Sequence, residues 1–256
     1  MILLLLHGFT GDPASWDEVV ERLPRATPVL RPALLGHGAG APIGDGGFLA
    51  EVDRIAAWLS ARAPEKKSAS DGESGIHVVG YSLGARVALG LLARHGEQFA
   101  RATLIGANSG LSDEKERIER RVCDERWAAL VEREGVARFV ERWLDQPLFA
   151  SQKRLPWEVR AIARARRLRH RPEGLAASLR TLGLGAMPDL TPGLAAIRQP
   201  VRLLAGAEDE KFRALAIRMS SLLFRGRVAI VPGAGHDLTL ERPDEVAAAL
   251  VSKETE

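Results

Sequence analysis

The stretch Gly80-Tyr81-Ser82-Leu83-Gly84 decides the fold of this chain. It follows the apolar run Ile76–Val79 and leads into a helical pattern over Leu83–His95. A G-x-S-x-G sequence between a strand and a helix is the setting of a nucleophile elbow, a turn too tight for a Cβ on either side of the serine. The turn holds the hydroxyl beyond the sheet edge, at the positive end of the helix. We therefore expect Ser82 to be catalytic, although an ordinary glycine-rich turn is the competing interpretation.

Outward from this stretch, strand-like and helix-like segments alternate along most of the chain. Such alternation predicts an α/β fold, a mostly parallel sheet with helices on both faces and the carboxyl ends of the strands along one edge. The expected strands are Ile2–Leu6, Thr27–Leu30, Ile76–Val79, Ala102–Ile105, Val201–Leu204 and Val228–Val231. The expected helices are Ala14–Leu23, Phe48–Arg62, Leu83–His95, Phe212–Leu223 and Pro243–Val251.

The alternation breaks once, between Leu111 and Ala186, where the sequence shows only charged amphipathic helix interrupted by prolines. A long helical insertion between two strands predicts a cap over the functional edge of the sheet. The expected organisation is a core of residues 1–110, an inserted helical cap of 111–186 and a second core part of 187–256. A polar stretch, Pro64–Gly75, is expected to be a flexible surface loop.

Composition sets the outer limits of function. The chain has 256 residues, 46% of them hydrophobic, which suits one α/β domain with an insertion. Its net charge of +3 is too small to require nucleic acid or a membrane surface as a partner. The lone Cys123 excludes a disulfide framework and a cysteine metal site. The apolar start Met1–Leu6 stops after six residues and lacks a basic flank, so we expect a buried strand, no membrane span and a cytoplasmic protein. The oligomeric state stays open.

One short segment is strongly basic. Its bland interpretation is a solvated helix face; anion binding is the main alternative, and nucleic acid is disfavoured because aromatic residues for stacking are scarce. The segment spans residues 160–171 and contains no acid, and its basic residues are Arg160, Arg164, Arg166, Arg167, Arg169 and Arg171.

Partners for Ser82 follow the last two expected strands. Asp209 and His236 each come just after a strand, and the order serine, aspartate, histidine is that of the α/β-hydrolase fold. His236 is expected to take the proton of Ser82, and Asp209 to orient His236. Glu208 is the rival acid. The other histidines compete less well as the base because none follows a late strand.

A fourth element follows the first strand, in His7-Gly8-Phe9-Thr10. The backbone N–H groups of Phe9 and of Leu83, the residue after the nucleophile, are expected to form an oxyanion hole. We expect His7 to be a structural hydrogen-bonding residue, and His37 to lie in a loop near the mouth of the site.

Over nearly its whole length the sequence resembles the 2-succinyl-6-hydroxy-2,4-cyclohexadiene-1-carboxylate synthases, lyases of menaquinone biosynthesis in the α/β-hydrolase superfamily. Arg86, the stretch from Trp143 to Phe149 and Lys211 are the most particular markers, while Ala85 replaces a glycine usual in the family. The segments that carry the resemblance are His7–Gly11, Gly80–Arg86, Gln146–Ser151, Gly206–Arg213 and Gly235-His236.

The resemblance implies elimination of pyruvate from 2-succinyl-5-enolpyruvyl-6-hydroxy-3-cyclohexene-1-carboxylate, with Ser82 as the base and no metal or organic cofactor. Because this substrate is a small polycarboxylate, fixed arginines suit its pocket. The segment Glu116–Asp124 leaves open which cap arginine binds substrate, and Arg120 is the expected one. The implied substrate-binding residues are Tyr81, Arg86, Arg120, Trp143, Phe149, Arg167 and Lys211. Arg120 and Arg167 could instead be surface residues, and the two aromatics cap core.

Two other functions remain open at this point. A carboxylesterase or another acyl hydrolase would use the same triad by covalent catalysis, since one fold supports many reactions. A ligand-sensing protein on the same scaffold would not need an intact triad. The lyase interpretation depends on Arg86, Lys211 and the cap arginines together, which an esterase for neutral lipids would not need.

Overall fold

The computed structural model describes residues 1–38, 44, 46–62 and 75–252, and most of the expected loop Pro64–Gly75 lies outside these residues. Its centre is one six-stranded sheet in the order β2-β1-β3-β4-β5-β6, with every neighbouring pair parallel. The expected α/β fold with a parallel sheet is confirmed. The strands are β1 (Ile2–Leu6), β2 (Val29–Leu30), β3 (Ile76–Tyr81), β4 (Phe99–Ile105), β5 (Val201–Gly206) and β6 (Gly226–Val231).

Alternation within the strands divides the core into two layers. Leu4 and Leu6 of β1 belong to the larger hydrophobic cluster on one face, while Leu3 and Leu5 belong to the smaller cluster on the other. Because side chains of a strand alternate between faces, a strand that is apolar throughout must be covered on both sides. The opening leucine run is therefore a buried central strand.

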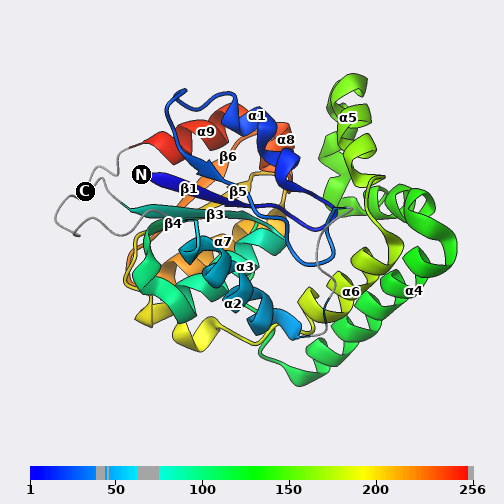
Figure 1. Ribbon diagram of the computed structural model, residues 1–256, viewed down its shortest axis with the longest axis horizontal. Coiled ribbons are helices and arrows are strands. Elements are labelled where there is room, and N and C mark those ends of the chain that lie inside the picture. Colours follow the sequence, from blue (N-terminus) through cyan, green and yellow to red (C-terminus); the bar gives the residue numbers. More distant parts are fainter. Residues whose placement is uncertain (39–43, 45, 63–74, 253–256) are drawn as a thin grey trace.

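Helices cover both faces of the sheet (Figure 1). Those on the larger cluster are α2 (Gly47–Ser60), α3 (Leu83–His95) and α7 (Glu210–Leu222), and those on the smaller cluster are α1 (Asp17–Val20) and α9 (Pro243–Val251). Shorter elements complete the core, namely α8 (Leu238–Glu241) and the 3-10 helices η1 (Pro13–Trp16), η2 (Gly96–Gln98) and η4 (Thr191–Ala196). The predicted boundaries of α3 and α9 match the structure, whereas the expected helix Ala14–Leu23 is a 3-10 turn followed by a single α-helical turn.

Between β4 and β5 all regular elements of the described chain are helical, and those that precede η4 lie beyond the carboxyl ends of the strands (Figure 1). The three prolines expected to interrupt this stretch are helix starts, because Pro147 and Pro172 occupy first-turn positions and Pro156 is an N-cap. The elements are α4 (Glu114–Leu144), η3 (Pro147–Arg154), α5 (Trp157–Arg167) and α6 (Pro172–Leu182).

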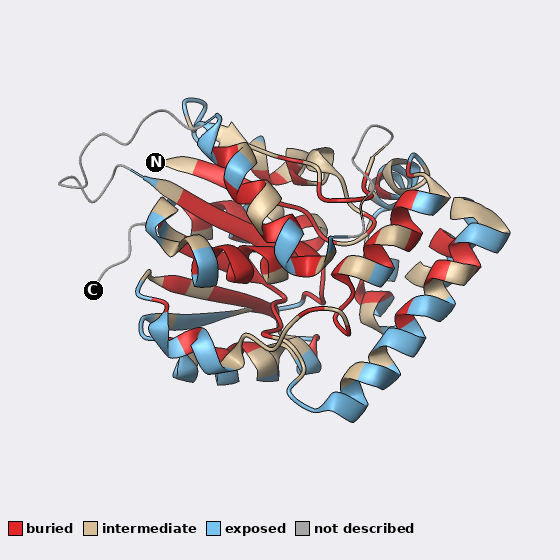
Figure 2. Cartoon of the chain, turned by 60° about the horizontal axis from the view of Figure 1, so that its bottom comes forward, coloured by how far each residue is buried: buried red, intermediate tan, exposed pale blue. Residues whose placement is uncertain are grey.

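These cap helices have a small core of their own. Phe139 and Val140 of α4 pack against Leu175 and Leu179 of α6, and the partly buried Phe9 of the sheet domain joins the cluster. Figure 2 shows buried residues concentrated in the sheet and its flanking helices, while the outer faces of the cap helices are exposed. None of the helices in the described ranges is long and apolar enough to cross a membrane.

Candidate active site

Ser82 lies in a strained turn between β3 and α3. Its φ of 52° and ψ of −107° place it where side-chain-bearing residues are rare. A Cβ at Gly80 would lie 2.3 Å from the carbonyl oxygen of Gly84, and a Cβ at Gly84 would lie 2.1 Å from that of Leu6. The N–H of Ser82 donates to the carbonyl of Ile105 over 2.8 Å. The two glycines and this bond together hold the hydroxyl at the carboxyl edge of the sheet.

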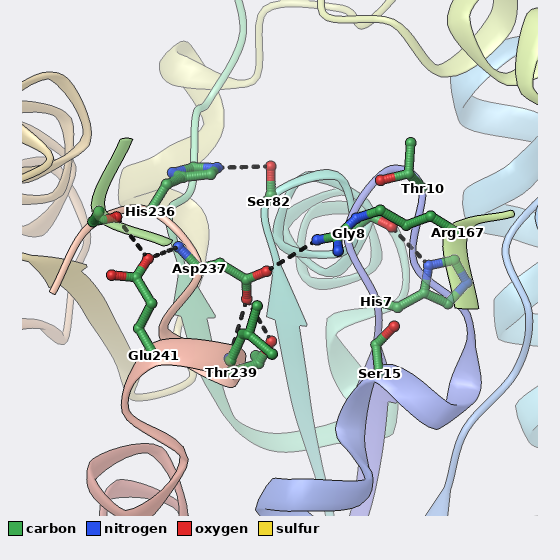
Figure 3. Close-up of polar contacts among 12 residues, drawn as sticks. His7, Gly8, Thr10, Ser15, Ser82, Arg167, His236, Asp237, Thr239 and Glu241 are labelled. Atoms are coloured by element: carbon green, nitrogen blue, oxygen red, sulfur yellow. Dashed lines mark hydrogen bonds and ion pairs between the residues drawn. The ribbon is translucent and has the colours of Figure 1, made fainter. Parts of the chain in front are cut away.

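Three side chains from distant parts of the chain form a hydrogen-bonded series at this edge. The Ser82 hydroxyl lies 3.0 Å from Nε2 of His236, and Nδ1 of His236 lies 2.7 Å from Oδ2 of Asp209. With Nδ1 donating to the carboxylate, Nε2 is free to accept the serine proton. Figure 3 shows His236 directed at Ser82. This geometry supports general-base activation of Ser82.

The rival acid Glu208 points elsewhere. Its carboxylate pairs with Arg154 over 2.6 Å at the surface, whereas the buried Asp209 contacts His236. Asp209 also begins α7, where its other oxygen accepts from the N–H of Phe212 at 3.3 Å. The helix start therefore fixes the orientation of the carboxylate that holds the histidine.

A second buried carboxylate supports the histidine loop. Glu241 accepts hydrogen bonds from the N–H groups of Gly235 (2.8 Å) and Asp237 (3.3 Å), the two neighbours of His236. The hydroxyl of Ser151, in η3 of the cap, donates to the same side chain over 3.0 Å. Burial raises the pKa of Glu241. Sequence reasoning missed this residue, because nothing local to Glu241 shows that it faces the loop (Figure 3).

The expected oxyanion loop is held by histidines. Thr10 has a φ of 63°; its N–H donates to Nε2 of His37 (3.2 Å), and its carbonyl accepts from Nε2 of His170 (2.8 Å). His7 has the expected structural role, bonding Gly8 and Leu34. His37 is fully buried between the rings of His7 and His170, not at the mouth of the site as expected.

Hydrogen bonding fixes the charge state of these three rings. In each, one nitrogen accepts from a backbone N–H and the other faces a backbone carbonyl, so only the neutral ring satisfies both. Burial accordingly lowers the pKa of His7 to about 4, and it lowers the pKa values of His37 and His170 as well. These three rings hold the loops around the site, whereas His236 makes the hydrogen bond to Ser82.

Two cavities meet at Ser82. One, of about 310 Å³, extends under α4 and α6; the other, of about 80 Å³, extends toward α5 and α8. Both are lined by Phe9, Ser82, Trp143, Leu148 and His236. Of the residues expected to bind substrate, the larger cavity is also lined by Arg86, Arg120 and Lys211, and the smaller by Tyr81, Phe149 and Arg167.

The larger cavity contains a cluster of charge. Arg86 donates to the carbonyl of Leu182 over 2.7 Å, and Arg120 donates to Asp124 over 2.9 Å. Burial, followed by the positive charge of Arg120, lowers the pKa of Arg86 to about 9, so its guanidinium is still charged at neutral pH. One buried oxygen of Asp124 has no hydrogen-bond partner among the described residues. Of the arginines in the segment Glu116–Asp124, only Arg120 lines this cavity.

The smaller cavity is more nearly neutral. Arg167 lies 3.7 Å from Asp237, whose other oxygen caps α8 through the N–H of Leu240. The ring of Tyr81 packs 5.4 Å from that of His236, and burial raises its pKa well above the ordinary value. Sequence reasoning missed Asp237 and Asp124. The spacing of Asp124, four residues after Arg120 on a helix, is the one local signal that predicts such a pair.

Aromatic rings join α4 to the loop after β1 that contains Phe9. Trp143 packs edge-on against Phe9 at 5.0 Å and stacks on Phe139 at 5.6 Å. It is therefore both cap core and cavity wall, the two roles that the sequence left as alternatives. The ring of Phe149 is tilted against that of Trp143, with 6.2 Å between the ring centroids. Lys211 is exposed at the cavity rim, with its ammonium 5.9 Å from the ring of Phe212.

Comparisons with known proteins agree with this architecture. The sequence profile described as "Alpha/beta hydrolase family" matches residues 3–249. The 2-succinyl-6-hydroxy-2,4-cyclohexadiene-1-carboxylate synthase of Salmonella paratyphi B is 34% identical over 248 residues, which cover 97% of this chain and 91% of that protein.

Solved structures give two further similarities. The structure of MenH from S. aureus superposes with a TM-score of 0.90 at 30% identity, covering 98% of this chain and 92% of that one. A thermophilic esterase from Thermogutta terrifontis, solved with malate bound, has a TM-score of 0.81 at 26% identity, covering 98% and 88%. The same fold thus occurs in a similar protein that is an esterase.

Proposed function

Since the chain belongs to the alpha/beta hydrolase family and, within it, to the 2-succinyl-6-hydroxy-2,4-cyclohexadiene-1-carboxylate synthases, we propose that it catalyses their reaction. That reaction is the elimination of pyruvate from 2-succinyl-5-enolpyruvyl-6-hydroxy-3-cyclohexene-1-carboxylate, a step of menaquinone biosynthesis. We place it in the cytoplasm and take its substrate to be a small polycarboxylate.

One observation supports this activity above the others. The cavity at Ser82 is lined by Arg86, Arg120 and Lys211, and Asp124 is the acid that neutralises part of their charge. Guanidinium groups fixed in a partly enclosed site bind carboxylates in a bidentate fork. A triad facing such a group of cations suits a substrate with several carboxylates better than it suits a neutral ester.

In the proposed step His236 takes the proton of Ser82, and the serine oxygen removes a proton from a ring carbon. The C–H electron pair becomes a new ring double bond, the existing ring double bond shifts by one position, and the bond between the ring and the enolpyruvyl oxygen breaks. The leaving enolate takes up a proton and becomes pyruvate. The N–H groups of Phe9 and Leu83 would stabilise the negative charge that develops, and Asp209 holds the imidazolium.

An acyl hydrolase is the second candidate, and the similarity to an esterase structure favours it. There Ser82 would attack an ester carbonyl and form an acyl-enzyme, with the same two N–H groups as the oxyanion hole. The two candidates differ in what Ser82 does, and therefore in which substrates are turned over.

Incubation with the enolpyruvyl precursor tests the proposal. The lyase should release pyruvate and the conjugated ring diene in equal amounts, the first measured by a coupled assay and the second by ultraviolet absorbance. A panel of neutral esters run beside it is the control. Rapid ester cleavage with no pyruvate would replace the lyase by the hydrolase.

A further inference from the structure

The arginines of the basic segment that belong to α5 lie on different faces of this helix. Arg160, Arg164 and Arg167 are spaced by four and three residues, so they lie on one face of the helix. Arg166 lies off this face and pairs with Asp17 of the core over 3.2 Å. The segment is therefore not a uniform solvated face.

That face lines a cavity of about 590 Å³ that α5 shares with the end of α4 and with η3. Cations outnumber acids around it. The cations are Arg138, Arg142, Lys153, Arg160, Arg164 and Arg167, and the acids are Glu141 and Asp145. Unlike an isolated surface charge, a concave wall of one sign concentrates the electrostatic field on a small ligand.

Partners already neutralise some of these cations. Arg138 pairs with Glu141 over 2.6 Å, and Lys153 pairs with Asp145 over 3.4 Å. In contrast, no ion pair or side-chain hydrogen bond links Arg160 or Arg164 to any residue in the described part of the chain. Their ten N–H donors are not all needed by the fold, and they are therefore free for a ligand.

This basic cavity adjoins the reaction pocket. Phe149, Ala163 and Arg167 line both the basic cavity and the smaller of the two cavities at Ser82. The side chain of Arg167 is only 12% exposed and lies 3.7 Å from Asp237, beside His236. The guanidinium of Arg167 is therefore the one charged group among the three residues that the two cavities share.

We propose that the basic cavity is a second anion-binding site, a capture site for the polycarboxylate that the reaction pocket consumes. Arg160 and Arg164 hold its carboxylates, and Arg167 is shared with the pocket where the chemistry occurs. The ligand class rests on the proposed function. A nucleic acid fits less well, because the cavity is lined by one aromatic residue, Phe149.

The test combines binding with kinetics. Propane-1,2,3-tricarboxylate serves as the probe, and glycerol as its uncharged counterpart. Side-chain Nε–H signals of Arg160 and Arg164, assigned by NMR from single lysine variants, should shift with the tricarboxylate and not with glycerol.

In the double variant Arg160→Glu/Arg164→Glu, kcat/KM for the enolpyruvyl precursor should fall about tenfold at low salt with kcat unchanged, because outer charges act on association. The difference should shrink in high salt.

The matched control is Arg126→Glu/Arg218→Glu, two exposed helical arginines that lie outside the cavity. An equal fall of kcat/KM in this control would reduce the effect to net charge and overturn the capture site. Unshifted signals of Arg160 and Arg164 at saturating probe would overturn it as well. Failure of the proposed function has a different signature, in which the probe still shifts both signals but the wild-type protein releases no pyruvate.

Discussion

At the scale of single residues, Arg86 is the side chain on which the proposed lyase activity depends most. Its guanidinium lines the cavity beside Ser82 and also holds the carbonyl of Leu182, so binding and structure are competing roles. Charge-assisted hydrogen bonds are worth about 1.5–3 kcal/mol. We therefore expect Arg86→Ala to lower kcat/KM for the anionic substrate roughly ten- to a hundredfold, and Lys211→Ala to have a smaller effect.

Cleavage of a small neutral ester by the same variant is the internal control for Arg86. Such an ester has no carboxylate for the guanidinium, so its turnover should change little. Equal losses on both substrates together with a lower melting temperature would assign Arg86 to the contact with α6 and remove it from substrate binding.

Glu241 is a positioning residue, since it acts through His236. Replacing its carboxylate in Glu241→Gln removes a charged acceptor from the N–H groups of Gly235 and Asp237. We expect kcat to fall about tenfold and KM to change little, because no substrate contact is lost. Ser151→Ala, which removes one donor to the same carboxylate, should have a smaller effect. A raised KM with normal kcat would contradict the positioning role.

At the scale of elements, the turn between β3 and α3 tolerates only glycine at its flanks. We expect Gly84→Ala to destabilise the protein by about 3 kcal/mol, since its Cβ would meet the carbonyl oxygen of Leu6 at 2.1 Å. Gly193→Ala is the control, because a Cβ there meets no heavy atom within 4 Å. Urea unfolding measures the free energy of unfolding of both variants. Equal values for Gly84→Ala and Gly193→Ala would show that a Cβ is tolerated at position 84.

The cap helices are the other functional element. Contacts tie them to the site at separate places, through Trp143 on Phe9, Ser151 on Glu241 and His170 on Thr10. We keep the division into core 1–110, cap 111–186 and core 187–256 as a proposal. In this arrangement the cap helps to hold the histidine and oxyanion loops as well as covering Ser82.

At the scale of the whole molecule, buried histidines make stability depend on pH. Burial lowers the pKa values of four of them, which are His7, His37, His77 and His170. The pKa of His7 falls to about 4 and that of His77 to about 3. Below pH 6.5, the histidine pKa in the unfolded chain, the unfolded state binds protons that the buried rings of the folded state do not bind. The free energy of unfolding therefore falls as the pH drops.

His7 and His77, whose folded-state pKa values lie well below this range, should each contribute about 1 kcal/mol to this loss between roughly pH 7 and 5.5. Urea unfolding at the two pH values measures it. The variant His77→Asn removes one titrating group far from Ser82, so its pH dependence should be shallower than that of the wild type. An unfolding free energy that stays constant over this range would contradict the neutral-histidine assignment.

Much of this architecture could be predicted from the sequence, because it depends on local patterns. Apolar runs located the central strands, and the glycines around Ser82 located the turn. The strand expected at Thr27–Leu30 is shorter, only Val29–Leu30. Asp124, Asp237 and Glu241 could not be found in the same way, since their importance lies in contacts that only the folded chain creates. Which cap arginine faces the cavity likewise depends on how α4 packs against α6.

Pyruvate release from the same enolpyruvyl precursor, compared between the wild-type protein and Ser82→Ala, tests whether Ser82 is the catalytic base. The three side chains of the series act as a unit, so we expect a loss of about a thousandfold or more with an unchanged melting temperature. Near-normal pyruvate release by Ser82→Ala would exclude Ser82 as the base.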